Sequence, residues 1–109
     1  MCVDRNLSRL DLDAAIVQAA AQPAAYVLLA DSGQYLYKGA CRNLQERLKD
    51  HRAGRVAHTR GRRPLAVLHV QYCDSFTAAR KLERYFKSGV GRAFLKNLAW
   101  VVEGQTQRT

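Results

Sequence analysis

The stretch of sequence that decides the fold is Tyr37-Lys38-Gly39-Ala40-Cys41-Arg42-Asn43-Leu44-Gln45-Glu46-Arg47-Leu48-Lys49-Asp50-His51. Its first residues end a β-rich run, and its later residues follow a helical pattern. Asn43 and Glu46 have the spacing of a variant capping box, which indicates that a helix begins here. Leu44 and Leu48 then lie on one face of that helix. We therefore predict a strand that leads into a helix over residues 44–52.

Upstream of this stretch, two β-rich runs predict a hairpin over residues 25–38. The runs are Tyr26-Val27-Leu28-Leu29 and Tyr35-Leu36-Tyr37, and they flank a turn at Asp31-Ser32-Gly33. Before the hairpin, Asp11 or Asp13 can cap an alanine-rich helix that Pro23 ends. We interpret residues 1–23 as a helical appendage.

Downstream, residues 54–64 are basic and punctuated by glycine, which predicts a loop. Residues 66–72 have the pattern of a third strand with a buried centre. Ser75 or Thr77 then caps a strongly amphipathic helix, and Gly89 is placed to end it.

The C-terminal part is less regular. Residues 91–96 predict a short helix, and residues 98–102 fit either a final strand or a continuation of that helix. The pattern as a whole predicts an α/β domain with a small central three-stranded antiparallel sheet flanked by helices. We assign the domain to residues 24–97 and a C-terminal extension to residues 98–109.

The charge of the chain points to a polyanionic partner. Lysine and arginine number 18 against 9 acidic residues, so the formal net charge is +9. Residues 1–30 carry a net charge of −1, residues 31–64 of +6 and residues 65–109 of +4. Most of these cations are arginines, whose planar guanidinium can bind two phosphate oxygens. Nucleic acid is therefore favoured over a merely solvated basic surface.

Cysteine usage and hydropathy bear on the compartment. Cys2, Cys41 and Cys73 are odd in number and widely spaced, so they predict neither a disulfide framework nor a structural zinc site. The sequence shows no recognisable signal peptide or membrane span. We expect reduced thiols, a cytoplasmic location and no association with a membrane.

The order of the chemically active side chains indicates a function. Tyr26 is followed after eleven residues by Tyr37 and after ten more by Arg47. Glu83 comes later, on the predicted amphipathic helix. Hydrolysis of a phosphodiester needs a positioned water, a cation that holds the phosphate and a group that accepts protons. Tyrosines, an arginine and a carboxylate can meet these needs.

These motifs resemble those of the GIY-YIG nuclease superfamily, in particular its small stand-alone, excision-repair-nuclease-like members. The quoted stretch is similar to the second motif and the helix that follows it. Residues 58–65 resemble the threonine-to-arginine-proline loop, and residues 78–96 resemble the glutamate helix and its tail. The first motif departs from the pattern, since Ala24-Ala25-Tyr26 stands where glycine-isoleucine-tyrosine is typical. Ala40 also stands where some members carry lysine or a hydroxyl residue.

The resemblance implies a metal-dependent endonuclease that uses Mg²⁺ or Mn²⁺. It gives Tyr26 the role of activating water, Arg47 that of binding the scissile phosphate and Glu83 that of holding the ion. Tyr37 and His51 would orient groups or relay protons. A role of Tyr26 as a base requires that nearby cations and the metal lower its pKa.

Each of these residues also has a simpler interpretation. Glu83 can be a surface glutamate that pairs with Lys87 four residues later. His51 can be a solvated helix histidine, and the two tyrosines can be ordinary cross-strand packing.

A further set of residues is expected to bind the nucleic acid, with DNA favoured over RNA. The set is Lys38, Arg42, Arg55, His58, Arg60, Arg62, Arg63, Lys87 and Arg92. Because the predicted domain is only a catalytic core, we expect it to recognise the structure of its substrate, as in DNA repair, or to take its specificity from a protein partner or homodimer.

Two other functions remain open at this point. The first is a nucleic-acid-binding module that keeps the scaffold without turnover, which the alanines in the motifs suggest. The second is an interaction adaptor whose basic loop binds an acidic protein. Salt-dependent binding to DNA would distinguish the adaptor from the nuclease, because phosphate contacts release counterions.

Overall fold

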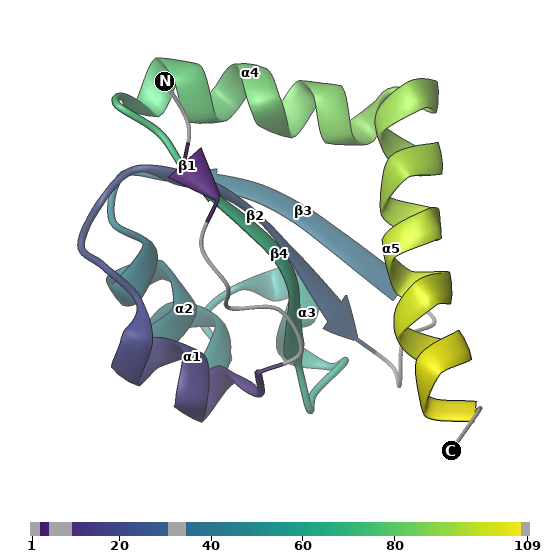
Figure 1. The fold of residues 1–109 in the computed structure, drawn as a ribbon. Helices are drawn as coiled ribbons and strands as arrows, with labels where there is room; N and C mark the ends of the chain where they lie inside the picture. The colour runs from purple at the N-terminus through teal and green to yellow at the C-terminus, as the bar shows by residue number, and fades with distance from the viewer. Residues whose placement is uncertain (1–2, 5–9, 31–34, 108–109) are drawn as a thin grey trace.

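The structure, a computed structural model, describes residues 3–4, 10–30 and 35–107 (Figure 1). The elements in chain order are β1 (Val3–Asp4), α1 (Leu12–Gln18), β2 (Ala24–Ala30), β3 (Tyr35–Cys41), α2 (Leu44–Arg52), α3 (Ala57–Arg60), β4 (Ala66–Tyr72), α4 (Phe76–Lys87) and α5 (Gly89–Gln107). The strands form one antiparallel sheet in the order β1-β4-β2-β3. The predicted three-stranded sheet is therefore confirmed as β4-β2-β3. The two-residue strand β1 extends it at one edge, which the sequence analysis did not predict.

Local capping explains where the helices begin. The side chain of Asn43 accepts a hydrogen bond from the backbone N of Glu46 at 3.1 Å, which starts α2 at the predicted position. Ser75, rather than Thr77, caps α4 through the backbone N of Ala78. The predicted turn at residues 31–33 lies outside the described residues. The predicted basic loop contains one short helix, α3.

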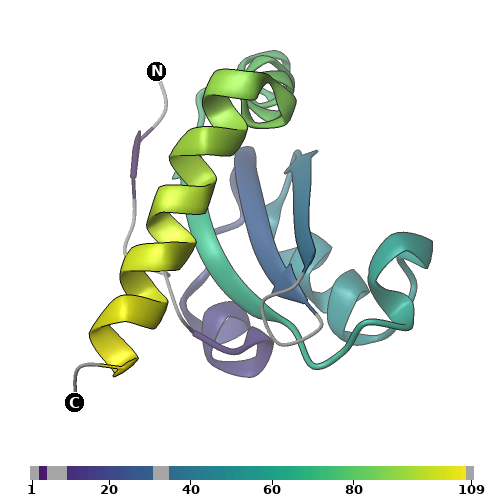
Figure 2. The same cartoon turned by 90° about the vertical axis from the view of Figure 1, so that its right-hand side faces the viewer.

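Helices lie on both sides of the sheet, as Figure 2 shows, and an apolar cluster fills the space on each side. On one face, Tyr26 and Leu28 of β2 pack with Leu44 and Leu48 of α2. Helix α1 adds Leu12 and Ala15 to this same cluster. The prediction that residues 1–23 form an appendage is therefore wrong for α1, because its buried side chains complete the core.

The other face of the sheet is covered by α4 and α5, where Val27 and Leu68 pack with Phe86 and Leu95. Residues 91–96 and 98–102 belong to one continuous helix, so the expected boundary at residue 97 falls inside α5. Helix α4 ends at Lys87 with Ser88 as its C-cap, so its end next to Gly89 is confirmed, and Gly89 itself is the first residue of α5. A Cβ at Gly91 would lie 1.8 Å from the carbonyl oxygen of Tyr85, so only glycine permits this close approach of α5 to the end of α4.

Two expectations about the compartment can be compared with the structure. Cys41 is a buried free thiol, as expected. Cys73 is disulfide-bonded, so the expectation of reduced thiols is wrong for this residue. Cys2 lies outside the described residues. In the described part of the chain, no helix combines the length and the hydropathy that a membrane crossing requires.

Candidate active site

The site is built around Tyr26, which lies on the central strand β2 and is fully buried. Tyr26 pairs with Gly39 of β3. A Cβ at Gly39 would lie 2.6 Å from both Cζ and Oη of Tyr26. The glycine of the second motif therefore leaves the space that the ring of Tyr26 occupies. Any larger residue would displace the tyrosine.

The hydroxyl of Tyr26 has two partners on helix α2. His51 Nε2 lies 2.8 Å from it, and Arg47 Nε donates to it at 3.3 Å. Arg47 and His51 are four residues apart, so both side chains project from one face of the helix. Because arginine can only donate, the Tyr26 hydroxyl accepts from Arg47, and we assign the hydrogen of the hydroxyl to its other partner, His51 Nε2.

Thr59 of α3 completes this chain of hydrogen bonds. His51 Nδ1 lies 2.8 Å from Thr59 Oγ1, and both residues are fully buried. Since Nε2 accepts the proton of Tyr26, Nδ1 carries the ring hydrogen and donates to Thr59. Burial, followed by the charge of Arg47, lowers the pKa of His51 to about 4. His51 is thus a neutral acceptor near pH 7, and the interpretation as a solvated histidine is wrong.

The environment of Tyr26 does not match the expected electrostatics. Burial is the main effect and raises the pKa of Tyr26, with a further contribution from Tyr37. The hydrogen bond and the charge of Arg47 lower the pKa, but by less. The expectation that cations make Tyr26 more acidic is therefore wrong for the protein alone. Deprotonation of Tyr26 needs a proton acceptor, and His51 stands in hydrogen-bond contact with it.

Tyr37 and Arg47 connect this buried group to the surface. The ring centroid of Tyr37 lies 6.1 Å from that of Tyr26 and 5.0 Å from that of His51. The side chain of Arg47 hydrogen-bonds to Tyr37 as well as to Tyr26 and is 37% exposed. Its guanidinium is therefore fixed on one side and accessible to a ligand on the other.

Glu83 lies on α4 and reaches this region across the edge strand β3. It lines a pocket of about 340 Å³ together with Tyr37, Lys38, His58 and Lys87. The side chain of Glu83 is 17% exposed, and its Oε2 lies 2.6 Å from Lys87 Nζ. The simpler interpretation, that Glu83 pairs with Lys87, is therefore confirmed, and Glu83 also faces a pocket. Glu83 and Tyr37 line the same pocket, and among the described residues no hydrogen bond or ion pair joins Glu83 to Arg47.

The described residues contain no group of three or more His, Cys, Asp and Glu side chains that would enclose a metal ion. The donor set around Glu83 is one carboxylate open to a pocket. Mg²⁺ and Mn²⁺ accept such a set, because they bind through one or two carboxylates and complete their shell with water and substrate oxygens. Glu83 therefore fits an ion whose other ligands are water and substrate oxygens, once Lys87 no longer pairs with the carboxylate.

The residues expected to bind nucleic acid divide into two groups. Those near the pocket of Glu83 are Lys38, His58 and Lys87, which line it, and Arg62, which lies 4.0 Å over the ring of Tyr35. Arg92 lines a neighbouring pocket that shares Lys38.

The other group is used within the protein or lies elsewhere. Arg42 lies 4.2 Å over the ring of Phe76, and Arg55 pairs with Asp50 at 3.3 Å. Arg63 donates to the carbonyl oxygens of Arg60 and Arg52 at 3.1 and 3.2 Å. It lines a different pocket, with Asp11 and Asp13. Arg60 is exposed at the end of α3.

Thr59 is the residue that the sequence analysis did not select. It stands inside the loop that resembles the threonine-to-arginine-proline motif, which was the available signal. A threonine in a basic loop has many simpler roles, and only the burial of both partners shows its contact with His51.

Several known proteins are similar to this chain in sequence. A UPF0213 protein of Streptococcus sanguinis is 38% identical over 79 residues, which cover 72% of this chain and 86% of that protein. A UPF0213 protein of Lactiplantibacillus plantarum is 40% identical over 77 residues, 68% of this chain and 75% of that protein. A UPF0213 protein of Natronomonas pharaonis is 39% identical over 62 residues, 56% of this chain and 73% of that protein. No solved structure matches significantly.

The family comparison covers the whole site. The GIY-YIG catalytic domain matches residues 22–97, a range that contains both tyrosines, α2, α3 and the glutamate helix α4. The chain therefore belongs to the GIY-YIG catalytic domain family.

Proposed function

We propose that this protein is a metal-dependent endonuclease that hydrolyses phosphodiester bonds in nucleic acid, DNA in preference to RNA. The observation that carries the proposal is the hydrogen-bonded chain from Thr59 through His51 and Tyr26 to Arg47. It joins a buried proton acceptor to a half-exposed cation. Next to it, a pocket holds a carboxylate. The family to which the chain belongs supports the same chemistry.

Arg47 is the group that binds the scissile phosphate. Its Nε is held by Tyr26, and its partly exposed guanidinium has terminal N–H groups that can donate to phosphate oxygens as charge develops on them. Asp50 lies 3.8 Å from Nη1 and is exposed to the same extent as Arg47, so this contact is weak enough to yield to a phosphate.

Tyr26 and His51 together move the proton of the attacking water. The raised pKa of Tyr26 excludes a standing phenolate, so the tyrosine gives its proton to His51 Nε2 as it takes one from water. Binding of the phosphate places negative charge beside Arg47 and offsets the charge that disfavours protonated His51. Thr59 holds the imidazole in the tautomer that can accept this proton.

Glu83 would hold the divalent ion at the edge of β3. When bound there, the ion polarises the phosphate and stabilises the leaving oxygen. Lys87 now donates to this carboxylate, and with the ion bound there the lysine would be available to contact the nucleic acid. Tyr37, between Arg47 and the pocket, orients the substrate.

A catalytically inactive nucleic-acid-binding module is the second candidate. It is favoured by the closed Glu83 to Lys87 pair and by the alanines of the first motif. Both functions predict DNA binding that weakens steeply with salt, so only turnover separates them.

The test is a cleavage panel of branched, flapped, nicked, duplex and single-stranded substrates with Mg²⁺, Mn²⁺ or neither. We expect cleavage of one substrate structure that requires the ion. Binding without cleavage, with all substrates and ions, would support the inactive module. Assays with candidate protein partners, and a measurement of the oligomeric state, would show whether specificity comes from a partner or a homodimer.

A further inference from the structure

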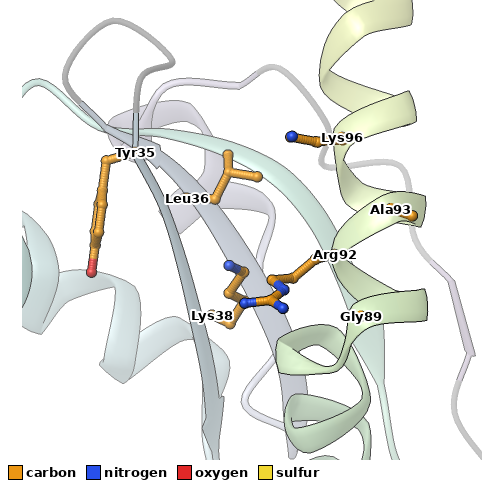
Figure 3. A pocket seen from close by; sticks show the side chains of 7 residues that line it. All are labelled: Tyr35, Leu36, Lys38, Gly89, Arg92, Ala93 and Lys96. Atoms are coloured by element: carbon orange, nitrogen blue, oxygen red, sulfur yellow. The ribbon is translucent and has the colours of Figure 1, made fainter.

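A second basic pocket lies between the edge strand β3 and helix α5. Its volume is about 600 Å³, and the residues that line it are Tyr35, Leu36, Lys38, Gly89, Arg92, Ala93 and Lys96. Figure 3 shows that Arg92 and Lys96 extend from α5 toward β3, while Lys38 extends from β3 toward α5. The ring of Tyr35 points to the opposite side of the strand. The three cations thus converge around Leu36.

Among the described residues, no acidic group pairs with the cations of this pocket. No carboxylate lines it, and none of the ion pairs of the described residues includes Lys38, Arg92 or Lys96. Burial, then repulsion by Arg92 and Lys87, lowers the pKa of Lys38. Arg92 and Lys87 thus disfavour the charged form of the half-buried Lys38, and an anion bound in the pocket would offset this repulsion.

The pocket adjoins the one that contains Glu83 and shares three lining residues with it. Tyr35, Leu36 and Lys38 line both, so an extended ligand can pass from one to the other along β3. One lysine and one arginine from α5 and a lysine from β3 approach from different directions. This arrangement suits an anion with several oxygens, such as a phosphate, better than a planar carboxylate.

We propose that Lys38, Arg92 and Lys96 form a subsite for a phosphate other than the scissile one. This subsite proposal rests on the proposed function, because the scissile phosphate of the same nucleic-acid strand would occupy the pocket of Glu83. The subsite adds Lys96 to the nucleic-acid-binding residues and gives Arg92 a defined ligand. A phosphate held there fixes the register of the strand without reading its bases.

The test is oligonucleotide binding without divalent ions, measured over a range of salt concentrations. The variant is Arg92→Gln with Lys96→Gln, and the control is Lys81→Gln with Lys49→Gln. The control pair is exposed, lines neither pocket and removes the same charge. Loss of one phosphate contact should weaken binding about tenfold and reduce the salt slope by about 0.7 to 0.9 relative to the control. Equal thermal unfolding of both double variants would show that the fold is retained.

Oligonucleotides with and without a terminal phosphate separate the two sources of the ligand. A backbone phosphate predicts the same variant effect on both, and a terminal phosphate predicts an effect on the phosphorylated one alone. If the Arg92 and Lys96 variant matches its control in affinity and slope, the subsite is refuted. If the Arg92 and Lys96 variant binds more weakly than its control but the wild-type protein cleaves no substrate, only the nuclease proposal is refuted. If the wild-type protein cleaves but the variant binds as its control does, only the subsite is refuted.

Discussion

Tyr26→Phe tests the proposed proton path most directly. The substitution keeps the ring that Gly39 accommodates and removes only the hydroxyl. That hydroxyl is the atom through which Arg47 and His51 are connected. If it carries the proton of the attacking water, the cleavage rate should fall by roughly 10²-fold or more, the usual size of a general acid-base contribution.

The effect on stability follows from the same contacts. From the sequence alone, the substitution should hardly change stability, since the ring is retained. The structure changes this expectation, because His51 Nε2 is fully buried and would lose its donor. An unsatisfied buried acceptor costs about 1–3 kcal/mol of the free energy of unfolding. The variant should thus be folded but measurably less stable.

Two control variants separate the chemistry from this loss of stability. Tyr72 is also a buried tyrosine of the same core, and its hydroxyl accepts a hydrogen bond from the backbone N of Ala20 at 2.9 Å. Tyr72→Phe should therefore lose similar stability and keep its rate. Tyr35→Phe, on β3 at the margin of the site, should be nearly silent in both. Single-turnover cleavage at saturating metal is the measurement, and equal rates for wild type and Tyr26→Phe would refute the mechanism.

The remaining predictions concern the ion, the basic loop and the buried histidine. Glu83→Gln should abolish cleavage while DNA binding stays nearly intact. A cleavage assay and the DNA affinity without metal measure the two effects, and full activity of the variant would show that Glu83 does not hold the ion. Replacement of Arg60, Arg62 and Arg63 by glutamine should reduce the salt slope of binding by about two units, because Arg63 is engaged with backbone carbonyls. A slope equal to that of wild type would show that the loop does not contact the nucleic acid. The pKa of His51 is lower in the folded protein, so on acidification the unfolded chain takes up a proton at this residue first. The contribution of neutral His51 to stability is therefore fully present above about pH 6.5 and is lost as the pH falls toward 4. Thermal unfolding should show a loss of roughly 2 kcal/mol between pH 6.5 and 5 that His51→Gln lacks, and a flat profile in wild type would contradict the burial of a neutral histidine. Thr59→Val keeps the shape of the side chain but removes the acceptor for His51 Nδ1, so it should lower both the stability and the cleavage rate. Thr77 is exposed, so the control Thr77→Val should lower neither.

The elements that the sequence predicted well are those with a local cause. Helix α2 and strand β4 were found with the predicted boundaries, because the cap at Asn43 and the strand pattern of residues 66–72 act within a few residues. Strand β1 has two residues and exists through its pairing with β4, so no local pattern announces it. The continuity of α5 was hidden by Gly89 and Gly91, which resemble helix ends in a sequence.

The same distinction applies to the site. The family motifs identified Tyr26, Tyr37, Arg47 and His51, and the structure brings these four side chains together. The direction of the pKa shift of Tyr26 could not be predicted, because it depends on how completely the core excludes water. The spacing of charges along a sequence contains no information about that exclusion.

The geometry also shows why the altered first motif is compatible with the family fold. Ala24 lies within strand β2, paired with Cys41 and Tyr72 and fully buried, so its backbone is extended and does not need glycine. Gly39 differs, because its missing Cβ is what admits the ring of Tyr26. Of the two glycines that the family pattern names, this chain has kept the one that the tyrosine requires. The alanines of the first motif are therefore weak evidence for an inactive protein, and the state of the Glu83 to Lys87 pair is the stronger criterion.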